Sequence, residues 1–140
     1  MLGSLAPTRT CAALARYGEQ LGIAFQISDD VIDICTPATE SGKTPGTDLR
    51  EGVVTVPVLH ALADADAHRL RELVAAGPVT DPDRHAEALA LLRVSPGLEA
   101  ARADVRRYAS MAAAELDPLP PIPASAALTG LCDFVRYRTA

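Results

Sequence analysis

The sequence predicts an all-α fold, a bundle of packed helices. Hydrophobic residues make up 49% of the 140 residues, which is enough to build a core, and alanine and leucine dominate among them. Only 4% of the residues are aromatic and β-branched runs are few, so the composition favours helices over a sheet. Apolar residues also recur at helical spacing along most of the chain. We expect one domain spanning residues 1–140, because no linker divides the chain.

The first expected element is one long helix over residues 8–35. This stretch contains no proline, and its apolar residues repeat at helical spacing. The next segment, TPATESGKTPGTD, covers residues 36–48 and places two prolines and two glycines in a polar context. That composition predicts a loop, and loops of this length often carry function.

Further helices are expected in the rest of the chain. Pro57 is tolerable in the first turn of a helix, and Asp81 and Ser95 each precede a proline, which is the pattern of a cap followed by a first-position proline. The sequence DPLPPIP stiffens the connection to the last helix. The expected helices are one from Pro57 through Leu62, then residues 66–75, residues 83–93, one ending near Leu116, and residues 124–138.

Charge and cysteine content argue against several classes of protein. The net charge of −5 makes a general attraction to nucleic acid unfavourable. No run of about 18 apolar residues is present, so we expect no transmembrane segment. The first residues lack the features of a signal peptide. The three cysteines form no CxxC pair, which is typical of reduced thiols and predicts a cytoplasmic protein.

The stretch FQISDDVID, residues 25–33, places Asp29, Asp30 and Asp33 in an otherwise apolar helix. At about 100° per residue, the three aspartates and Gln26 form one stripe with apolar residues on both sides. A solvated helix face does not usually look like this. Two glycines lie two and three turns upstream on the same side, at positions 18 and 22, and leave room beside the carboxylates, so the helix is expected to carry a slot.

The acidic stretch requires compensation of its charge. Carboxylates this close raise one another's pKa unless a cation is present, and no lysine or arginine lies at the spacing of a helical ion pair. Oxygen ligands in a groove suit Mg²⁺, which often shares its shell with substrate phosphates. The alternative is a plain acidic patch near a helix end. That placement is unfavourable against the helix dipole.

The loop that follows offers a cation and a further acid. Lys43 follows a glycine, and Asp48 opens the sequence DLREG. The lysine could fold back over the acidic groove and meet a phosphate that metal ions bridge to the carboxylates. The alternative is a solvent-exposed loop lysine.

Three segments in order, YGEQLGIAFQISDDVID, GKTPGTDLREG and TVPVLHAL, resemble the second aspartate-rich region of the trans-isoprenyl diphosphate synthases, the polyprenyl synthetase family. The resemblance implies the C-terminal portion of the isoprenoid synthase fold, with helices around a central cavity. It also implies an activity: an allylic diphosphate, held by Mg²⁺, is elongated by isopentenyl diphosphate. Asp29, Asp30 and Asp33 match the second metal-binding motif, with Asp29 as the direct ligand, and Asp48 matches an acid near the metal shell.

The resemblance gives roles to three further residues. Phe25 and Gln26 match the pair that borders the isopentenyl site. Lys43 matches a lysine that contacts the allylic diphosphate, and with the three aspartates of the motif it forms the expected catalytic set. The family usually has a lysine where this chain has Val53, so one diphosphate contact is missing or supplied elsewhere.

The first aspartate-rich motif of the family has no counterpart in these 140 residues. We therefore expect the C-terminal part of a synthase, with little or no prenyl transfer as a lone chain. The alternative is a noncatalytic partner that docks on a full-length synthase. A class I terpene cyclase is a third interpretation, which the loop GKTPGTDLREG argues against. A dimer is the family habit, so a homo-oligomer or a partner subunit is expected.

Other polar residues give weaker signals. His60, His68 and His85 show no ligand spacing with cysteine, and we expect them to be hydrogen-bonded or surface residues. Arg136 and Arg138 could approach a diphosphate in the intact fold, but we expect them to form a solvated basic end on the last helix, which the helix dipole favours.

Overall fold

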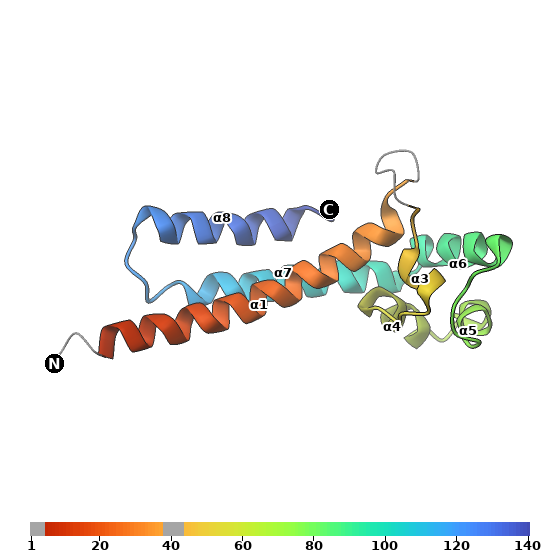
Figure 1. The fold of residues 1–140 in the computed structure, drawn as a ribbon, viewed down its shortest axis with the longest axis horizontal. Coiled ribbons are helices and arrows are strands. Elements are labelled where there is room, and N and C mark those ends of the chain that lie inside the picture. Colours follow the sequence, from red (N-terminus) through yellow and green to blue (C-terminus); the bar gives the residue numbers. More distant parts are fainter. Residues whose placement is uncertain (1–4, 38–43) are drawn as a thin grey trace. The chain divides into compact units, whose positions relative to one another are not determined.

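The computed structural model describes residues 5–37 and 44–140. This part of the chain contains helices and no strand, which confirms the predicted all-α class (Figure 1). None of its helices combines the length and the apolar character needed to cross a bilayer. The helices are α1 (Leu5–Cys35), α3 (Thr47–Glu51), α4 (Val56–Ala63), α5 (His68–Val74), α6 (Pro82–Val94), α7 (Pro96–Glu115) and α8 (Pro123–Tyr137).

The observed helices agree with the predicted ones to within a few residues, with one exception. Helix α1 starts three residues earlier than predicted, with Pro7 in its first turn, where a missing N–H costs nothing. The exception is α3, because the sequence predicted a loop up to residue 48. Gly46 and Gly52 adopt left-handed φ values of 73° and 77° at its two ends. A helix of five residues is too short to show a helical period.

The chain forms two compact units, Met1–Gln26 with Asp104–Ala140, and Ile27–Ala103. Helices α1 and α7 each contribute residues to both units. We call them unit 1 and unit 2 and describe each by itself. The single domain expected over residues 1–140 stays a prediction.

Unit 1 combines the first part of α1 with the second part of α7 and with α8, which runs back antiparallel to α7 (Figure 1). Its core holds Tyr17, Ala112, Leu116 and Cys132. The Tyr17 hydroxyl donates a hydrogen bond to the Leu128 carbonyl at 2.9 Å. Burial, together with the neighbouring Cys132, raises the pKa of Tyr17 to about 12. The hydroxyl therefore stays protonated at neutral pH.

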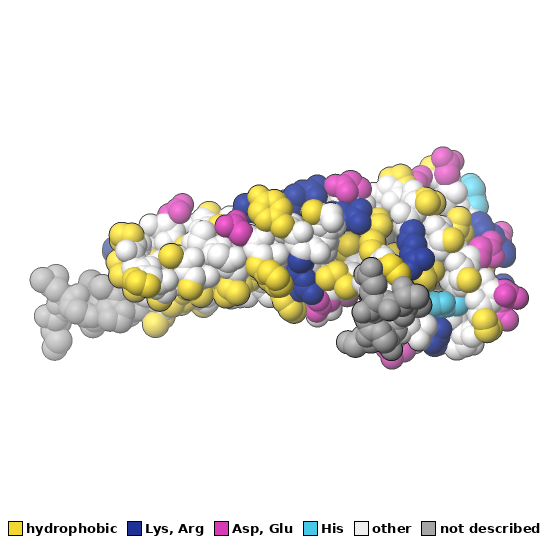
Figure 2. Space-filling view, turned by 90° about the horizontal axis from the view of Figure 1, so that it is seen from above, with side chains coloured by type: hydrophobic (Ala, Val, Ile, Leu, Met, Phe, Trp, Pro, Cys, Tyr) yellow, Lys and Arg dark blue, Asp and Glu magenta, His cyan; other side chains and the backbone are white. Residues whose placement is uncertain are grey.

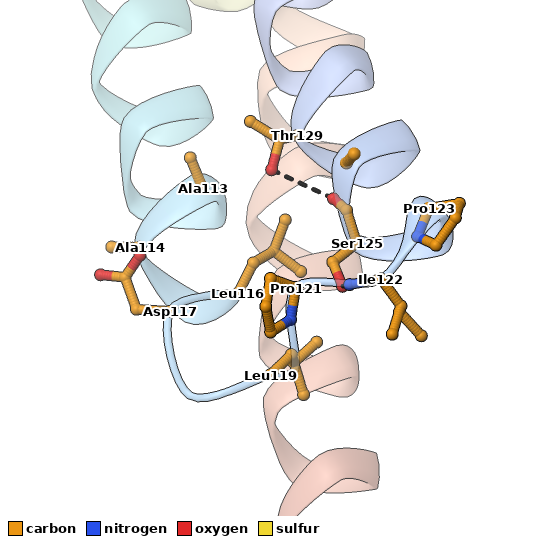
Figure 3. A pocket seen from close by; sticks show the side chains of 11 residues that line it. Ala113, Ala114, Leu116, Asp117, Leu119, Pro121, Ile122, Pro123, Ser125 and Thr129 are labelled. Atoms are coloured by element: carbon orange, nitrogen blue, oxygen red, sulfur yellow. Dashed lines mark hydrogen bonds between the residues drawn. The ribbon is translucent and has the colours of Figure 1, made fainter.

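The proline-rich connection between α7 and α8 borders an open groove of about 690 Å³ in unit 1. Leu116, Leu119, Pro121 and Ile122 lie around it, and Thr129 donates to the Ser125 carbonyl on its α8 side (Figure 3). Its lining contains only one ionisable side chain, Asp117. The groove therefore offers no cluster of ionisable side chains that could act in catalysis or bind a metal.

In unit 2, α6 contacts both α4 and α5, and the side chains of Leu73, Leu92 and Val31 are fully buried. Asp81 caps α6 as predicted, because its carboxylate accepts the Arg84 N–H at 2.9 Å.

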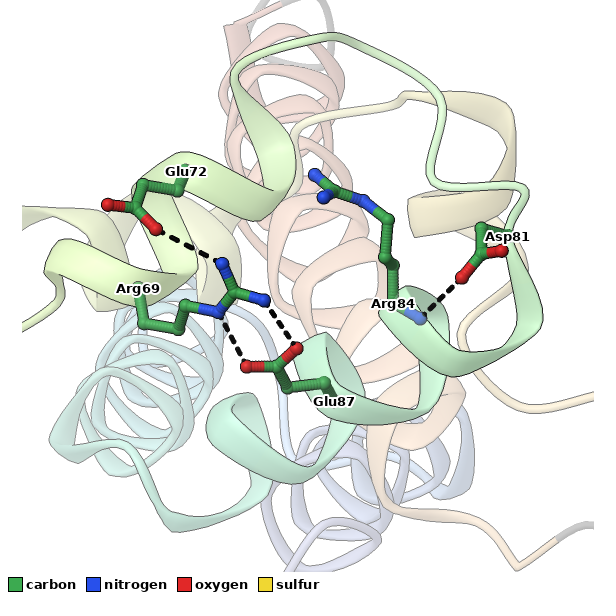
Figure 4. A network of polar contacts seen from close by, with 5 residues as sticks. All are labelled: Arg69, Glu72, Asp81, Arg84 and Glu87. Atoms are coloured by element: carbon green, nitrogen blue, oxygen red, sulfur yellow. Dashed lines mark hydrogen bonds and ion pairs between the residues drawn. The ribbon is translucent and has the colours of Figure 1, made fainter.

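An exposed ion-pair network joins α5 to α6 in unit 2 (Figure 4). Arg69 donates to both carboxylate oxygens of Glu87 at 2.6 and 2.8 Å and to Glu72 at 3.1 Å. These bonds hold the pKa of Glu87 below its usual value. Because the network is solvated, it contributes little to stability.

Candidate functional site

The acidic stretch occupies the last turns of α1. Its three aspartates all belong to unit 2, and they differ in burial. Asp30 is buried, whereas Asp29 and Asp33 are half-buried. The apolar flank predicted by the helical wheel is present, since Ile27 and Ile34 are only 5% and 2% exposed. The carboxylates therefore adjoin a packed core rather than an open polar face.

The two glycines upstream, Gly18 and Gly22 of unit 1, face open space. A Cβ atom built on either glycine meets nothing within 4 Å. The predicted slot beside the carboxylates stays a prediction, because those carboxylates belong to unit 2. Ile23, on the same helix, is 36% exposed.

Asp33 has backbone partners in α3. One carboxylate oxygen lies 3.2 Å from the Thr47 nitrogen, and the other lies 3.4 Å from the Asp48 nitrogen. The carbonyl of Asp33 also accepts the Gly46 N–H at 2.9 Å. Asp33 thus satisfies N–H groups at the start of α3 that have no partner within the helix. No local pattern indicates this role, because Asp33 lies 14 residues before Thr47.

Asp48 lies among negative charges in unit 2. Its pKa is raised, first by burial, and then by the carboxylates of Asp33, Asp30 and Glu51. The fold therefore brings Asp48 close to two of the three aspartates of the acidic stretch, although the loop separates them in sequence.

Cations reach the end of α1 from other helices of unit 2. Arg93 of α6 donates to the Ile34 carbonyl at 2.8 Å, and Arg102 of α7 lies 3.5 Å from the Cys35 sulfur. Positive groups at a helix C-terminus are favourable against its dipole. Asp29 and Asp30 also have interaction partners in the structure. The end of α1 therefore carries positive side chains from two other helices, which the sequence of α1 alone did not indicate.

Phe25 and Gln26, the expected substrate-bordering pair, lie on the surface of unit 1. The Phe25 ring is 44% exposed, and the Arg138 guanidinium lies 4.6 Å from its centroid. Arg138 also lies 5.7 Å from the Phe134 ring. The expectation of a solvated helix end is therefore wrong for Arg138, which is half-buried, because two aromatic rings provide a face for its planar guanidinium.

The remaining expected residues give a mixed result. Lys43 lies outside the described residues. Val53 is 48% exposed. His85 is buried and hydrogen-bonded to the Gly46 carbonyl oxygen at 2.8 Å, which confirms the expectation of a hydrogen-bonded histidine.

The donor set of the acidic stretch fits Mg²⁺ in one respect. Its groups are carboxylate oxygens, which hard cations prefer. In residues 5–37 and 44–140, no three His, Cys, Asp or Glu side chains could hold a metal ion by themselves. Mg²⁺ commonly takes one or two protein carboxylates and completes its shell with phosphate oxygens and water, and the carboxylates of the acidic stretch would be ligands of that kind.

Comparison with known proteins gives the family. A sequence model of the family "Polyprenyl synthetase" matches residues 1–92. The chain belongs to the polyprenyl synthetase family. It is 50% identical over 127 residues to a nonaprenyl diphosphate synthase of Mycobacterium tuberculosis, with 89% of this chain and 38% of that protein covered. It is 35% identical over 141 residues to heptaprenyl diphosphate synthase component 2 of Geobacillus stearothermophilus, with 98% and 43% covered.

Solved structures agree with this assignment. A geranylgeranyl pyrophosphate synthase of Corynebacterium glutamicum, complexed with calcium and isoprenyl diphosphate, matches with a TM-score of 0.83 and 42% identity. The match covers 91% of this chain and 40% of that one. The polyprenyl synthetase chain therefore has a portion of the isoprenoid synthase fold, which confirms the predicted fold class. It spans about two fifths of the length of the relatives it matches.

Proposed function

We propose that the chain contributes the second acidic motif of a prenyl diphosphate synthase. The reaction joins isopentenyl diphosphate to an allylic diphosphate and depends on Mg²⁺. One observation carries the proposal: the Asp33 carboxylate oxygens lie 3.2 Å and 3.4 Å from the backbone nitrogens of Thr47 and Asp48, which holds Asp48 beside the acidic stretch. Carboxylates held together in this way suit a hard cation that carries a diphosphate. Membership in the polyprenyl synthetase family supports the reaction class.

The aspartates hold the metal in this proposal. Asp29 is the direct ligand, and Asp30 and Asp48 complete the acidic surroundings. Asp33 adds negative charge beside the metal without being the direct ligand, because both of its carboxylate oxygens already accept hydrogen bonds from backbone N–H groups. When bound, Mg²⁺ neutralises the negative charge on the departing diphosphate.

The other residues bind and orient the two substrates. Phe25 and Gln26 border isopentenyl diphosphate, and Lys43 contacts the allylic diphosphate. Ionisation of the allylic carbon–oxygen bond gives a carbocation, which the double bond of isopentenyl diphosphate attacks, and loss of a proton completes the longer trans product. Apolar surroundings keep water away from the carbocation.

Calorimetric titration of Mg²⁺ and inorganic pyrophosphate into the 140-residue chain tests the site. We expect binding that requires both components and that falls about tenfold or more in Asp29→Asn, by analogy with the loss of partners around bound metals. Asp83→Asn is the matched control, because it removes the same charge from an exposed position at the start of α6. Equal binding by wild type and Asp29→Asn would contradict the proposed site.

Prenyl transfer tests the activity of the lone chain. The 140 residues contain no first aspartate-rich motif, so we expect no measurable elongation. The chain is incubated with Mg²⁺, farnesyl or geranylgeranyl diphosphate and labelled isopentenyl diphosphate, beside a full-length synthase of the family as a positive control. Robust elongation by the lone chain would refute the proposal that it is incomplete.

A noncatalytic partner subunit is the second candidate function. Large hydrophobic side chains reach the surface of unit 1 (Figure 2), and a similar protein is named as one component of a heptaprenyl diphosphate synthase. We propose that these side chains dock on a second copy of the chain or on a complete synthase. Co-purification with a synthase whose activity is unchanged when Asp29 and Asp30 are replaced by alanine would favour this function.

We also propose a cytoplasmic location. Cys11, Cys35 and Cys132 are free thiols, and reduced thiols are typical of that compartment. Thiol labelling of the protein in intact cells, followed by fractionation, checks the location. Recovery of the chain in an oxidised form from an extracytoplasmic fraction would contradict it.

A further inference from the structure

His85 is a buried histidine of α6 that none of the proposed roles uses. Its side chain is 6% exposed, and its Nε2 atom lies 2.8 Å from the carbonyl oxygen of Gly46. A carbonyl oxygen only accepts hydrogen bonds, so Nε2 carries the proton and donates. This contact joins residues that are 39 positions apart within unit 2.

Gly46 fits closely against this imidazole ring. Its φ of 73° is left-handed, and a Cβ atom built there lies 2.7 Å from Nε2 of His85 and 3.3 Å from Cδ1 of Leu89. The contact therefore requires glycine both for its backbone conformation and for space. The Gly46 carbonyl also accepts the Arg50 N–H at 3.2 Å, which starts the hydrogen bonding of α3.

From Gly46 the hydrogen bonds continue to the acidic stretch. The Gly46 N–H donates to the Asp33 carbonyl at 2.9 Å, and the next two N–H groups, those of Thr47 and Asp48, point to the Asp33 carboxylate. His85 is thus linked through a single residue to the segment that Asp33 caps and that presents Asp48.

We infer that His85 is a positioning residue for this segment. Its Nε2–H fixes the Gly46 carbonyl, and the start of α3 then holds the Asp33 carboxylate and the Asp48 backbone in place. The consequence for metal binding rests on the proposed function, whereas the positioning itself does not. A histidine that only filled space in the core would need no hydrogen-bond donor at Nε2.

Amide hydrogen exchange of the 140-residue chain tests the positioning. His85→Leu removes the donor and keeps an apolar side chain, and His85→Gln keeps an N–H donor of similar reach. Leu92→Ala is the control, because it destabilises the core from the same helix without touching the contact. Exchange is measured at Thr47 and Asp48 relative to the rest of unit 2.

We expect exchange at Thr47 and Asp48 to become about tenfold faster in His85→Leu, which is the size of effect that one hydrogen bond gives. His85→Gln should restore slow exchange, and Leu92→Ala should speed exchange throughout unit 2. Unchanged relative exchange in His85→Leu, or equal loss in His85→Gln, would overturn the inference.

¹⁵N NMR spectroscopy of the imidazole nitrogens in the wild-type chain provides a test that needs no variant. Protonated Nε2 of His85, with slow exchange of its proton, supports the inference. An unprotonated Nε2 excludes donation to Gly46 and overturns it.

Titration of Mg²⁺ with pyrophosphate into the same variants separates the two proposals. Weaker binding in His85→Leu and recovery in His85→Gln supports both. If the exchange results hold but the wild type binds no pyrophosphate, the proposed function fails and the positioning stands. If the wild type binds and the exchange at Thr47 and Asp48 does not respond, the positioning fails alone.

Discussion

The carboxylate of Asp33 does for α3 what a capping side chain does for most helices, although it belongs to α1. Both of its oxygens face backbone N–H groups. A group used in this way is less available to a cation than its neighbour Asp29. The three aspartates of the acidic stretch are therefore not equivalent, and substitution should separate the residue that supports α3 from the residue that binds metal.

Asp33→Ala should lower the free energy of unfolding by about 0.5 to 2 kcal/mol, the usual cost of losing a helix cap. Asp29→Ala, which leaves that cap intact, should lower the free energy of unfolding by less. Urea unfolding followed by circular dichroism measures both in metal-free buffer. An equal decrease in the free energy of unfolding in the two variants would show that the contact of Asp33 with α3 does not stabilise the chain.

Asp48 makes stability depend on pH in a predictable direction. Burial and neighbouring carboxylates raise its pKa above the ordinary 3.8, so the folded chain binds this proton more tightly than the unfolded chain. Its contribution is present in full below the unfolded pKa and is lost as the pH rises through the folded pKa.

Asp48→Asn should therefore be more stable than wild type at pH 7, and the difference should vanish on acidification below the ordinary pKa. The gain should stay below about 1 kcal/mol, because solvent screens a partly exposed side chain. Thermal unfolding of both proteins from pH 3 to 7, in metal-free buffer, measures it. A difference that grows toward low pH would reverse the assigned sign.

Among the described helices, α3 is the one that could not be predicted from the sequence. The long helices were predictable because apolar spacing, and Asp81 with its following proline, are local signals. The five residues of α3 instead depend on contacts from distant residues, since Asp33 caps its start and His85 holds Gly46.

The candidate site divides in the same way. The acidic stretch was predictable because Asp29, Asp30 and Asp33 share one side of one helix, and the approach of Asp48 followed from family resemblance. The contact of Arg138 with Phe25 was not predictable, because it joins the residue after the last helix to the first helix across 112 residues of intervening chain, and no local pattern encodes such a pairing.

Two glycines in helices give a matched test of packing between elements. A Cβ atom on Gly97 of α7 lies 2.6 Å from the Ala61 Cα atom of α4, whereas one on Gly130 of α8 meets nothing within 4 Å. Gly97→Ala should therefore destabilise the chain by about 1 to 3 kcal/mol through overpacking. Gly130→Ala should stabilise it by about 0.5 to 1 kcal/mol through helix propensity. Urea unfolding decides the signs, and a stable Gly97→Ala variant would refute the close approach of α4 and α7.

For the whole molecule, the exposed hydrophobic side chains predict association. Leu131, Phe134 and Tyr137 of α8 are 49%, 60% and 63% exposed, and adjacent exposed apolar side chains are typical of an interface. We expect the 140-residue chain to sediment as a species larger than the monomer.

Leu131→Lys should shift sedimentation toward the monomer, because a charge on α8 opposes burial of that face. Leu59→Lys is the matched control on unit 2, where the leucine is similarly exposed at 57%. A monomeric wild type, or equal effects of the two lysines, would exclude α8 as the surface of association.

The stacking of Arg138 on Phe25 gives access to an optical readout. The chain contains no tryptophan, so Phe25→Trp introduces a single indole at the expected substrate border. Its emission would respond to the guanidinium above it and to any molecule that displaces that guanidinium. Titration with isopentenyl diphosphate could then be followed by fluorescence, even if the isolated chain turns over no substrate.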